Sequence, residues 1–150
     1  MTLDVGESAP SISAPNQDGR EVEPSFEDPT VLYFYPQDGT PGCTTEATEF
    51  AAEDESYRAA GVTVYGISTD DAASHREFAA EQDLPFELLA DPDGEVAEAF
   101  GVSKEGGTAD RTTFMIENGE IERVYEGVDP NGHARTVLAD LLDRDAVSLE

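Results

Sequence analysis

The chain contains a single cysteine, Cys43, and its neighbours are unusual for a buried thiol. The segment "YFYPQDGTPGCTTEATEF" (33–50) places it behind Thr-Pro-Gly, where an apolar strand pattern ends and a helix pattern begins. Backbone N–H groups and the macrodipole at a helix N-terminus stabilise negative charge, so this position favours the nucleophilic thiolate. Because Gly42 and Thr44 flank the cysteine where an inert thiol usually has apolar surroundings, we expect an exposed or half-exposed sulfur.

Residues around Cys43 suit a reactive thiol. Pro41 fixes one backbone dihedral and Gly42 lets the backbone come close, so amides can face whatever approaches the sulfur. Thr40 can place a hydroxyl, which both donates and accepts hydrogen bonds, next to the same approach to the sulfur. Glu46, one turn into the helix, opposes thiolate formation. We therefore expect a cation to reach the sulfur from another part of the chain.

The segments that must position this thiol alternate between strand and helix patterns. Apolar runs at 30–36, 62–68 and 86–91 predict strands. Helices are predicted at 44–60, at 70–83 with Asp70 as the N-cap, at 93–101 and at 131–145. The run 111–127 predicts a hairpin around Asn118-Gly119, and Asp18-Gly19 predicts a small N-terminal hairpin.

This order predicts an α/β fold. The helix between the strands at 31 and 62 implies a parallel pair, while the Asn-Gly turn imposes an antiparallel neighbour. We expect a mixed central sheet with helices on both faces, an N-terminal β-hairpin extension, and one domain over residues 1–150. The carboxyl ends of parallel strands are where such sheets place their sites, and Cys43 follows the first of these strands.

The amino-acid composition indicates the environment in which the protein works and disfavours two classes of partner. The formal net charge is -26, from 34 acidic and 8 basic residues. Scattered carboxylates with a single lysine are typical of a salt-adapted cytosolic protein, since salt screens their repulsion. So negative a surface disfavours nucleic acid and anionic lipid. Neither a secretory signal nor a membrane-spanning run is present, which predicts a cytoplasmic protein.

The segment "FYPQDGTPGCTTE" resembles the active-site segment of the peroxiredoxins, specifically the bacterioferritin-comigratory (PrxQ-type) group. Pro36, Thr40 and Cys43 occupy the positions of its Pro-x-x-x-Thr-x-x-Cys pattern. Further segments match this group in order: "GESAPSISAPNQDG", "GISTDDAASHREFA", "LPFELLADPDGEVAEAFGV" and "RTTFMIENGEI". The resemblance implies a thioredoxin-like fold, in agreement with the predicted elements.

The same resemblance implies reduction of hydrogen peroxide and organic hydroperoxides, with Cys43 passing through a sulfenic acid. It assigns Thr40 and Arg111 as catalytic partners, Arg111 being the cation that the thiolate requires. Pro36, which shields the thiolate from water, and Gly42 complete the expected substrate-binding mouth. No cofactor is expected.

One position departs from the pattern of this group. Many members carry a resolving cysteine five residues after the first, but Thr48 stands there. No intramolecular disulfide can form, so an external thiol must reduce the sulfenic acid. A thioredoxin-like protein, a glutaredoxin-like protein and a small thiol all remain open as donors.

The sequence is also compatible with two other functions: a redox sensor whose sulfenic acid recruits a partner, and a binding domain with an inert Cys43. We expect His75 to support its helix and His133 to lie at the surface. Two separated histidines without a carboxylate cluster predict no metal site. Both a monomer and a homodimer are compatible with the sequence.

Overall fold

The computed structural model describes residues 3–102, 109–126 and 132–148, the last eight of these by their backbone alone. Its elements are β1 (Ala14–Pro15), β2 (Glu21–Val22), β3 (Thr30–Phe34), α1 (Pro41–Ala52), α2 (Asp54–Ala59), β4 (Thr63–Ser68), α3 (Ala72–Gln82), β5 (Glu87–Ala90), α4 (Glu95–Phe100), β6 (Thr112–Glu117), β7 (Glu120–Glu126) and α5 (His133–Ser148).

The main sheet has the order β5-β4-β3-β6-β7 and is mixed, as predicted. β3 pairs with β4 in parallel and with β6 antiparallel, so the strand that leads to Cys43 lies at the centre. All five of its residues are buried. A continuous apolar run is what a strand covered on both faces requires.

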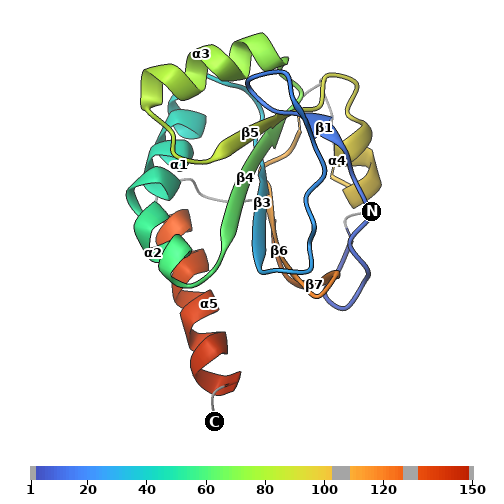
Figure 1. Cartoon of the computed structure of the whole chain (residues 1–150), viewed down its shortest axis with the longest axis vertical. Coiled ribbons are helices and arrows are strands. Elements are labelled where there is room, and N and C mark those ends of the chain that lie inside the picture. Colours follow the sequence, from blue (N-terminus) through green and yellow to red (C-terminus); the bar gives the residue numbers. More distant parts are fainter. Residues whose placement is uncertain (1–2, 103–108, 127–131, 149–150) are drawn as a thin grey trace.

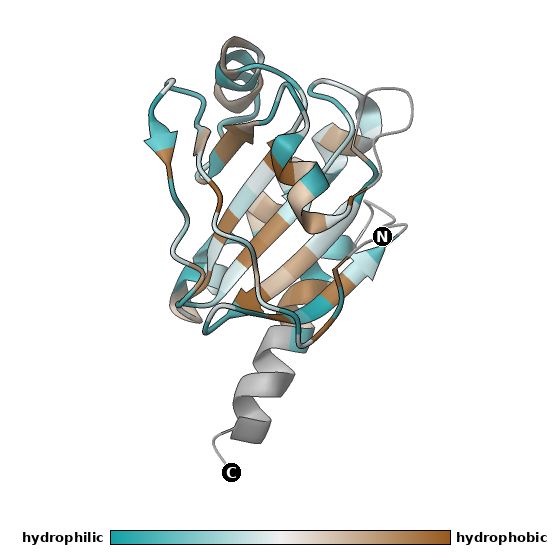
Figure 2. Cartoon of the chain, turned by 90° about the vertical axis from the view of Figure 1, so that its right-hand side faces the viewer, coloured by the Kyte–Doolittle hydropathy of each residue, from teal (hydrophilic) through white to brown (hydrophobic). Residues whose placement is uncertain are grey.

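Helices cover both faces of this sheet. α1, α2, α3 and α5 lie on one face, whereas α4 and the N-terminal segment lie on the other (Figure 1). Apolar residues colour the central strands brown beneath α4 and the N-terminal segment, and hydrophilic residues dominate the loops (Figure 2). The predicted thioredoxin-like fold with helices on both faces is confirmed.

Two glycines are required by local geometry. Asn118 and Gly119 have φ values of 56° and 73°, which close the β6–β7 hairpin by a two-residue turn. At Gly66 in β4, a Cβ would lie 2.8 Å from the Tyr33 ring and from Leu88. Any larger residue there would displace the aromatic ring that packs under the Cys43 helix.

The N-terminal hairpin is also confirmed. β1 and β2 pair antiparallel around Asp18-Gly19, where Gly19 has a φ of 79°. A bridge from Asn16 to Leu89 lays this hairpin against β5, so it covers part of the sheet edge.

Two helix predictions are corrected. The pattern at 44–60 forms two helices, α1 and α2, which meet at Glu53 with φ -96° and ψ 3°. After this break Tyr57 of α2 is buried, and its hydroxyl donates to the Ala134 carbonyl of α5 at 2.6 Å. The N-cap of α3 is Asp71 rather than Asp70, because Asp71 Oδ1 accepts from the Ser74 amide at 2.8 Å. The start of the 131–145 prediction and the side chains of its last five residues lie outside the described residues.

Candidate active site

Cys43 is the third residue of α1, in the first turn of the helix. Thr40 is the N-cap, with the extended backbone that an N-cap adopts, and Pro41 occupies the first helical position, where its missing N–H costs nothing. The Thr44 amide donates to the Thr40 carbonyl at 2.9 Å, which closes the first turn. The sulfur therefore lies at the positive end of the helix dipole.

The sulfur is more buried than the sequence predicts. Cys43 is 1% exposed, so the expectation of an exposed or half-exposed thiol is wrong. Cys43, Ala47 and Phe50 follow helical spacing and all face the sheet. They pack in one cluster that includes Tyr33, whose ring stacks on Phe50 with centroids 4.7 Å apart. The polar flanks of Cys43 misled the prediction because the helix face, rather than the sequence neighbours, sets its burial.

A cation from a distant strand reaches this buried sulfur. Arg111 Nη2 donates to Cys43 Sγ at 3.5 Å, and Nη1 donates to Glu46 Oε1 at 2.7 Å. The β3–β6 register explains the approach, because Thr112 pairs with Phe34 and so brings the start of β6 to the end of β3. One guanidinium thus hydrogen-bonds to both the sulfur and the carboxylate.

Burial shapes the charges of this group. Burial raises the pKa of Glu46 to about 7, although the charge and the hydrogen bond of Arg111 oppose it. One carboxyl oxygen, Glu46 Oε2, is buried without a hydrogen-bond partner among the described residues. Burial would lower the pKa of Arg111, but the charges of Glu46 and Cys43 outweigh it and raise that pKa. The guanidinium therefore stays charged and stabilises negative charge on the sulfur.

The other predicted residues surround the start of the same helix. Pro36, Thr40 and Gly42 are half-buried in and next to the loop between β3 and α1. The Thr40 hydroxyl donates to the Gln37 carbonyl at 3.2 Å, which leaves its oxygen able to accept a further hydrogen bond. These residues thus lie close in sequence to Cys43, while Arg111 joins them through the sheet.

Comparisons with known proteins agree with this geometry. Residues 5–124 match the AhpC/TSA family. Peroxiredoxin Bcp of Bacillus subtilis is 35% identical over 153 residues, which cover 95% of this chain and 98% of that protein. The chain belongs to the AhpC/TSA family of peroxiredoxins.

Solved structures extend this result to the fold. Xanthomonas campestris bacterioferritin comigratory protein, described for its alkyl peroxide reduction activity, superposes with a TM-score of 0.86 at 30% identity, covering 94% of this chain and 99% of that chain. A PrxQ variant from Xylella fastidiosa gives a TM-score of 0.90 at 29% identity, covering 97% and 99%. This peroxiredoxin is a thiol-dependent peroxidase, and its single cysteine fits the one-cysteine mechanism.

The sequence did not predict a polar network that lies beside the active site. Ligand atoms of Asp38, Asp70 and His75 lie within 4.8 Å of one another, so the expectation that no carboxylates gather near a histidine is wrong. His75 is fully buried and bonds to Asp38, 37 residues away. No local sequence pattern predicts this network, because its residues come from three parts of the chain. Tyr35 and Asp38 follow β3, Asp70 follows β4, and Ser74 and His75 lie in α3.

His133 is also misplaced by the sequence. It is 7% exposed rather than a surface residue, and its Nε2 lies 2.9 Å from Thr113 Oγ1 of β6. Its ring packs edge-on against Phe50 of α1 and Tyr125 of β7. Because His133 is the first residue of α5, these contacts join α5 to the sheet and to α1, the helix that carries Cys43.

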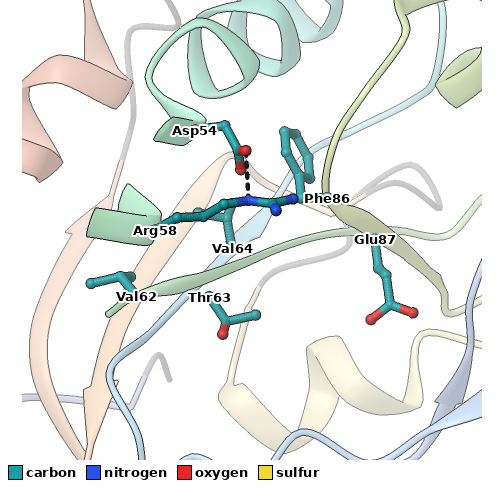
Figure 3. A pocket seen from close by; sticks show the side chains of 7 residues that line it. All are labelled: Asp54, Arg58, Val62, Thr63, Val64, Phe86 and Glu87. Carbon is teal, nitrogen blue, oxygen red and sulfur yellow. Dashed lines mark ion pairs between the residues drawn. The ribbon is translucent and has the colours of Figure 1, made fainter. Parts of the chain in front are cut away.

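A pocket of about 290 Å³ lies apart from the thiol. It is lined by Asp54 and Arg58 of α2, Val62, the start of β4, Phe86 and the start of β5, and an Arg58–Asp54 ion pair of 2.8 Å crosses it (Figure 3). This pocket lies between α2 and the amino ends of β4 and β5, whereas Cys43 follows the carboxyl end of β3. We therefore do not place the peroxidase chemistry of the peroxiredoxin there.

Proposed function

We propose that this peroxidase reduces hydrogen peroxide and alkyl hydroperoxides at Cys43, with Thr40 and Arg111 as catalytic partners. The contact of 3.5 Å between Arg111 Nη2 and Cys43 Sγ carries the proposal. A guanidinium at this distance stabilises the thiolate before the reaction. It can then donate to the peroxide oxygens as negative charge develops on the departing one.

The first step is a displacement at oxygen. The Cys43 thiolate attacks one peroxide oxygen, the S–O bond forms, the O–O bond breaks, and the sulfur loses two electrons. The departing hydroxide or alkoxide takes a proton and leaves as water or alcohol, while Cys43 becomes a sulfenic acid. Thr40 accepts the peroxide O–H hydrogen bond, and Pro36 and Gly42 shape the mouth around it.

An external thiol closes the cycle. It attacks the sulfenic sulfur and releases water, and the resulting mixed disulfide is reduced by a second thiol to regenerate Cys43. The missing resolving cysteine supports this route, since Thr48 stands in its place. The Thr48 hydroxyl donates to the Thr44 carbonyl within α1 at 2.8 Å. Thioredoxin-like proteins, glutaredoxin-like proteins and small thiols fit this requirement.

The proposed setting is the cytosol of a salt-adapted cell, with the protein as a monomer or a homodimer. The net charge of -26 supports the salt adaptation. None of the described helices has the length and apolar character needed to cross a bilayer.

Steady-state peroxide consumption tests the reaction and the roles of its residues. Wild type should turn over many times with a thiol donor, whereas Cys43→Ser should consume no peroxide. Arg111→Met should lower kcat/KM by about 10²- to 10³-fold. Arg111→Lys keeps the charge but loses the two parallel N–H donors of the guanidinium, so its kcat/KM should lie between those of wild type and Arg111→Met. Consumption that stops at one equivalent would favour the sensor, and turnover by Cys43→Ser would refute the site.

A further inference from the structure

His75 lies at 0% exposure in α3, and both nitrogens of its ring face oxygen acceptors. Nε2 is 2.8 Å from the Leu89 carbonyl, and Nδ1 is 2.7 Å from Asp38 Oδ2. A carbonyl can only accept, so Nε2 carries a proton. Burial would raise the pKa of Asp38, but the hydrogen bond and the charge of His75 outweigh it and lower that pKa. Both Asp38 oxygens also accept from hydroxyl groups, Oδ1 from Tyr35 and Oδ2 from Ser74, as the oxygens of an ionised carboxylate do, so the geometry places Nδ1 as a donor as well.

Asp38 is the point at which the loop between β3 and α1 is fixed. Its carboxylate also accepts from the Tyr35 hydroxyl at 2.6 Å and from Ser74 Oγ at 2.8 Å. Its backbone amide donates to Asp70 Oδ2 at 2.7 Å, and Ser68 Oγ donates to the same oxygen at 2.9 Å. Contacts from the end of β3, the end of β4 and α3 thus converge on one residue of the loop.

This anchored residue lies between two residues of the proposed peroxide mouth. Pro36 comes two positions before Asp38, and Thr40 comes two positions after it and caps the Cys43 helix. A shift of Asp38 would therefore be passed along a few backbone bonds to Thr40. Displacements of about 1 Å in such groups can cost a hundredfold in rate.

A metal site is the alternative use of this cluster, since Asp38, Asp70 and His75 are chemically able to bind a cation. These side chains already have hydrogen-bond partners: Asp38 bonds to His75, Tyr35 and Ser74, and His75 to the Leu89 carbonyl. Asp70 accepts from Ser68 Oγ and from the Asp38 amide. A doubly protonated imidazole has no lone pair for a metal. The arrangement is that of a buried ion pair.

We propose that the His75 imidazolium and the Asp38 carboxylate form a positioning pair that holds Pro36 and Thr40 in place for peroxide binding. The inference rests on the proposed role of Thr40. The pair acts on the residues that bind peroxide and not on the charge of Cys43. The sulfur is contacted by Arg111 instead, which immediately precedes β6 and is separate from this loop.

The protonation of His75 can be measured without any activity. The titratable groups that meet its ring are Asp38, Tyr35 and Asp70. At pH 7, ¹⁵N NMR of the His75 side chain should show two protonated nitrogens in wild type. In Asp38→Asn, where the amide can donate to the ring, Nδ1 should lose its proton. An unprotonated nitrogen in the wild-type ring would overturn the ion pair.

Kinetics test the positioning role. His75→Gln should lower kcat/KM for hydrogen peroxide by about ten- to a hundredfold, while the alkylation rate of Cys43 by iodoacetamide, which reports the thiolate, stays within about twofold. The double variant with Asp38→Asn should lose little more than either single variant, because the two residues act as a unit. Unchanged kcat/KM in both single variants would refute the role.

A matched control separates positioning from loss of stability. Val96→Ala removes a buried side chain of α4, in the apolar cluster on the other face of the sheet, and should leave kcat/KM unchanged despite a lower free energy of unfolding. Equal slowing of alkylation and peroxide reduction in Asp38→Asn would contradict the inference. Peroxide turnover by Cys43→Ser would instead refute the proposed function, and the NMR result would stand by itself.

Discussion

Two acidic side chains of the site, Cys43 and Glu46, hydrogen-bond to one guanidinium. Arg111 bonds to Glu46 and to Cys43 at once, and Glu46 is fully buried. The carboxylate and the thiolate therefore compete for the same guanidinium. A protonated Glu46 leaves more of the positive charge to the sulfur, so the raised pKa of Glu46 favours the reactive form of the site.

The pKa of Glu46 predicts a pH dependence of stability. Between its ordinary value of 4.5 and the folded value of about 7, the folded chain keeps a proton that the unfolded chain has lost. The stability from this proton is complete below pH 4.5 and is lost as the pH rises through 7. The loss of about 3 kcal/mol in free energy of unfolding should be absent in Glu46→Gln, which can still accept from Arg111.

Urea unfolding of both proteins at pH 5 and pH 8 measures this difference. Subtracting the Glu46→Gln values removes the contributions of other titrating groups. A wild-type minus variant difference that is the same at both pH values would show that Glu46 titrates normally.

The sequence predicted the site only where its residues are neighbours or match a family segment. Cys43, Thr40 and Glu46 lie within seven residues, and Arg111 could be named through the resemblance alone. Asp38 and His75 look like ordinary polar residues of a loop and a helix. Their pairing depends on where α3 crosses the end of β3, which no local pattern encodes.

The elements divide into those that carry the site and those that hold it in place. α1 carries Cys43 and packs against α5, where the Gly132 amide donates to Glu49 Oε1 at 2.7 Å. His133 extends this junction to β6 through Thr113, two residues after Arg111, which immediately precedes that strand. α5 thus supports both the thiol helix and the strand that delivers the cation.

The His133 side chain predicts an acid-sensitive junction. Burial, with the nearby charge of Arg111, lowers the pKa of His133 from 6.5 to about 4. Between these values the unfolded chain takes up a proton that the folded chain cannot, so the free energy of unfolding should fall as the pH drops from 6.5 towards 4. We expect a loss of about 1–3 kcal/mol, which His133→Asn should remove while keeping a hydrogen-bonding group near Thr113.

This slope is opposite in sign to that of Glu46, so the two partly cancel in wild type. Chemical unfolding of His133→Asn from pH 4.5 to 7 isolates the histidine. If wild type and variant lose stability in parallel as the pH drops, His133 does not control the acid response.

Strong periodic patterns made the elements predictable. The strands and the Asn118-Gly119 turn follow the prediction because β-branched runs and positive φ preferences act locally. The prediction of one helix over 44–60 failed at Glu53, a residue with no helix-breaking character of its own. Packing of Tyr57 against α5 sets that break, and the sequence contains no local record of it.

The whole molecule separates an apolar interior from a highly charged surface. Among the described acidic residues, Glu46 and Asp91 alone are buried. Asp91 accepts from the Val96 and Ala97 amides at the start of α4, each at 3.0 Å, so its charge has a structural use. The rest of the described carboxylates are at least partly exposed, where their mutual repulsion depends on salt.

The net charge of -26 predicts that salt stabilises this fold. Molar KCl shortens the Debye length to about 3 Å, which screens repulsion between surface carboxylates. The free energy of unfolding should rise by at least about 1 kcal/mol from dilute buffer to 2 M KCl, and activity should be kept or improved. Thermal unfolding and peroxide consumption across this range measure both effects.

An uncharged osmolyte at equal osmolality provides the control, because it acts by exclusion from the surface without screening charge. Equal stabilisation by the osmolyte and by KCl would assign the effect to exclusion. A fold that is more stable in dilute buffer would contradict the electrostatic explanation.

The central claim is that the fold makes Cys43 reactive although it buries the sulfur. The most direct test compares the rate at which hydrogen peroxide adds one oxygen to Cys43 in the folded chain and in the same chain unfolded in urea, followed by mass spectrometry. We predict that the folded chain reacts at least about a hundredfold faster, because Arg111 and the helix N-terminus act only when assembled. A folded chain whose Cys43 reacts no faster than the unfolded one would identify an inert core thiol and contradict the claim.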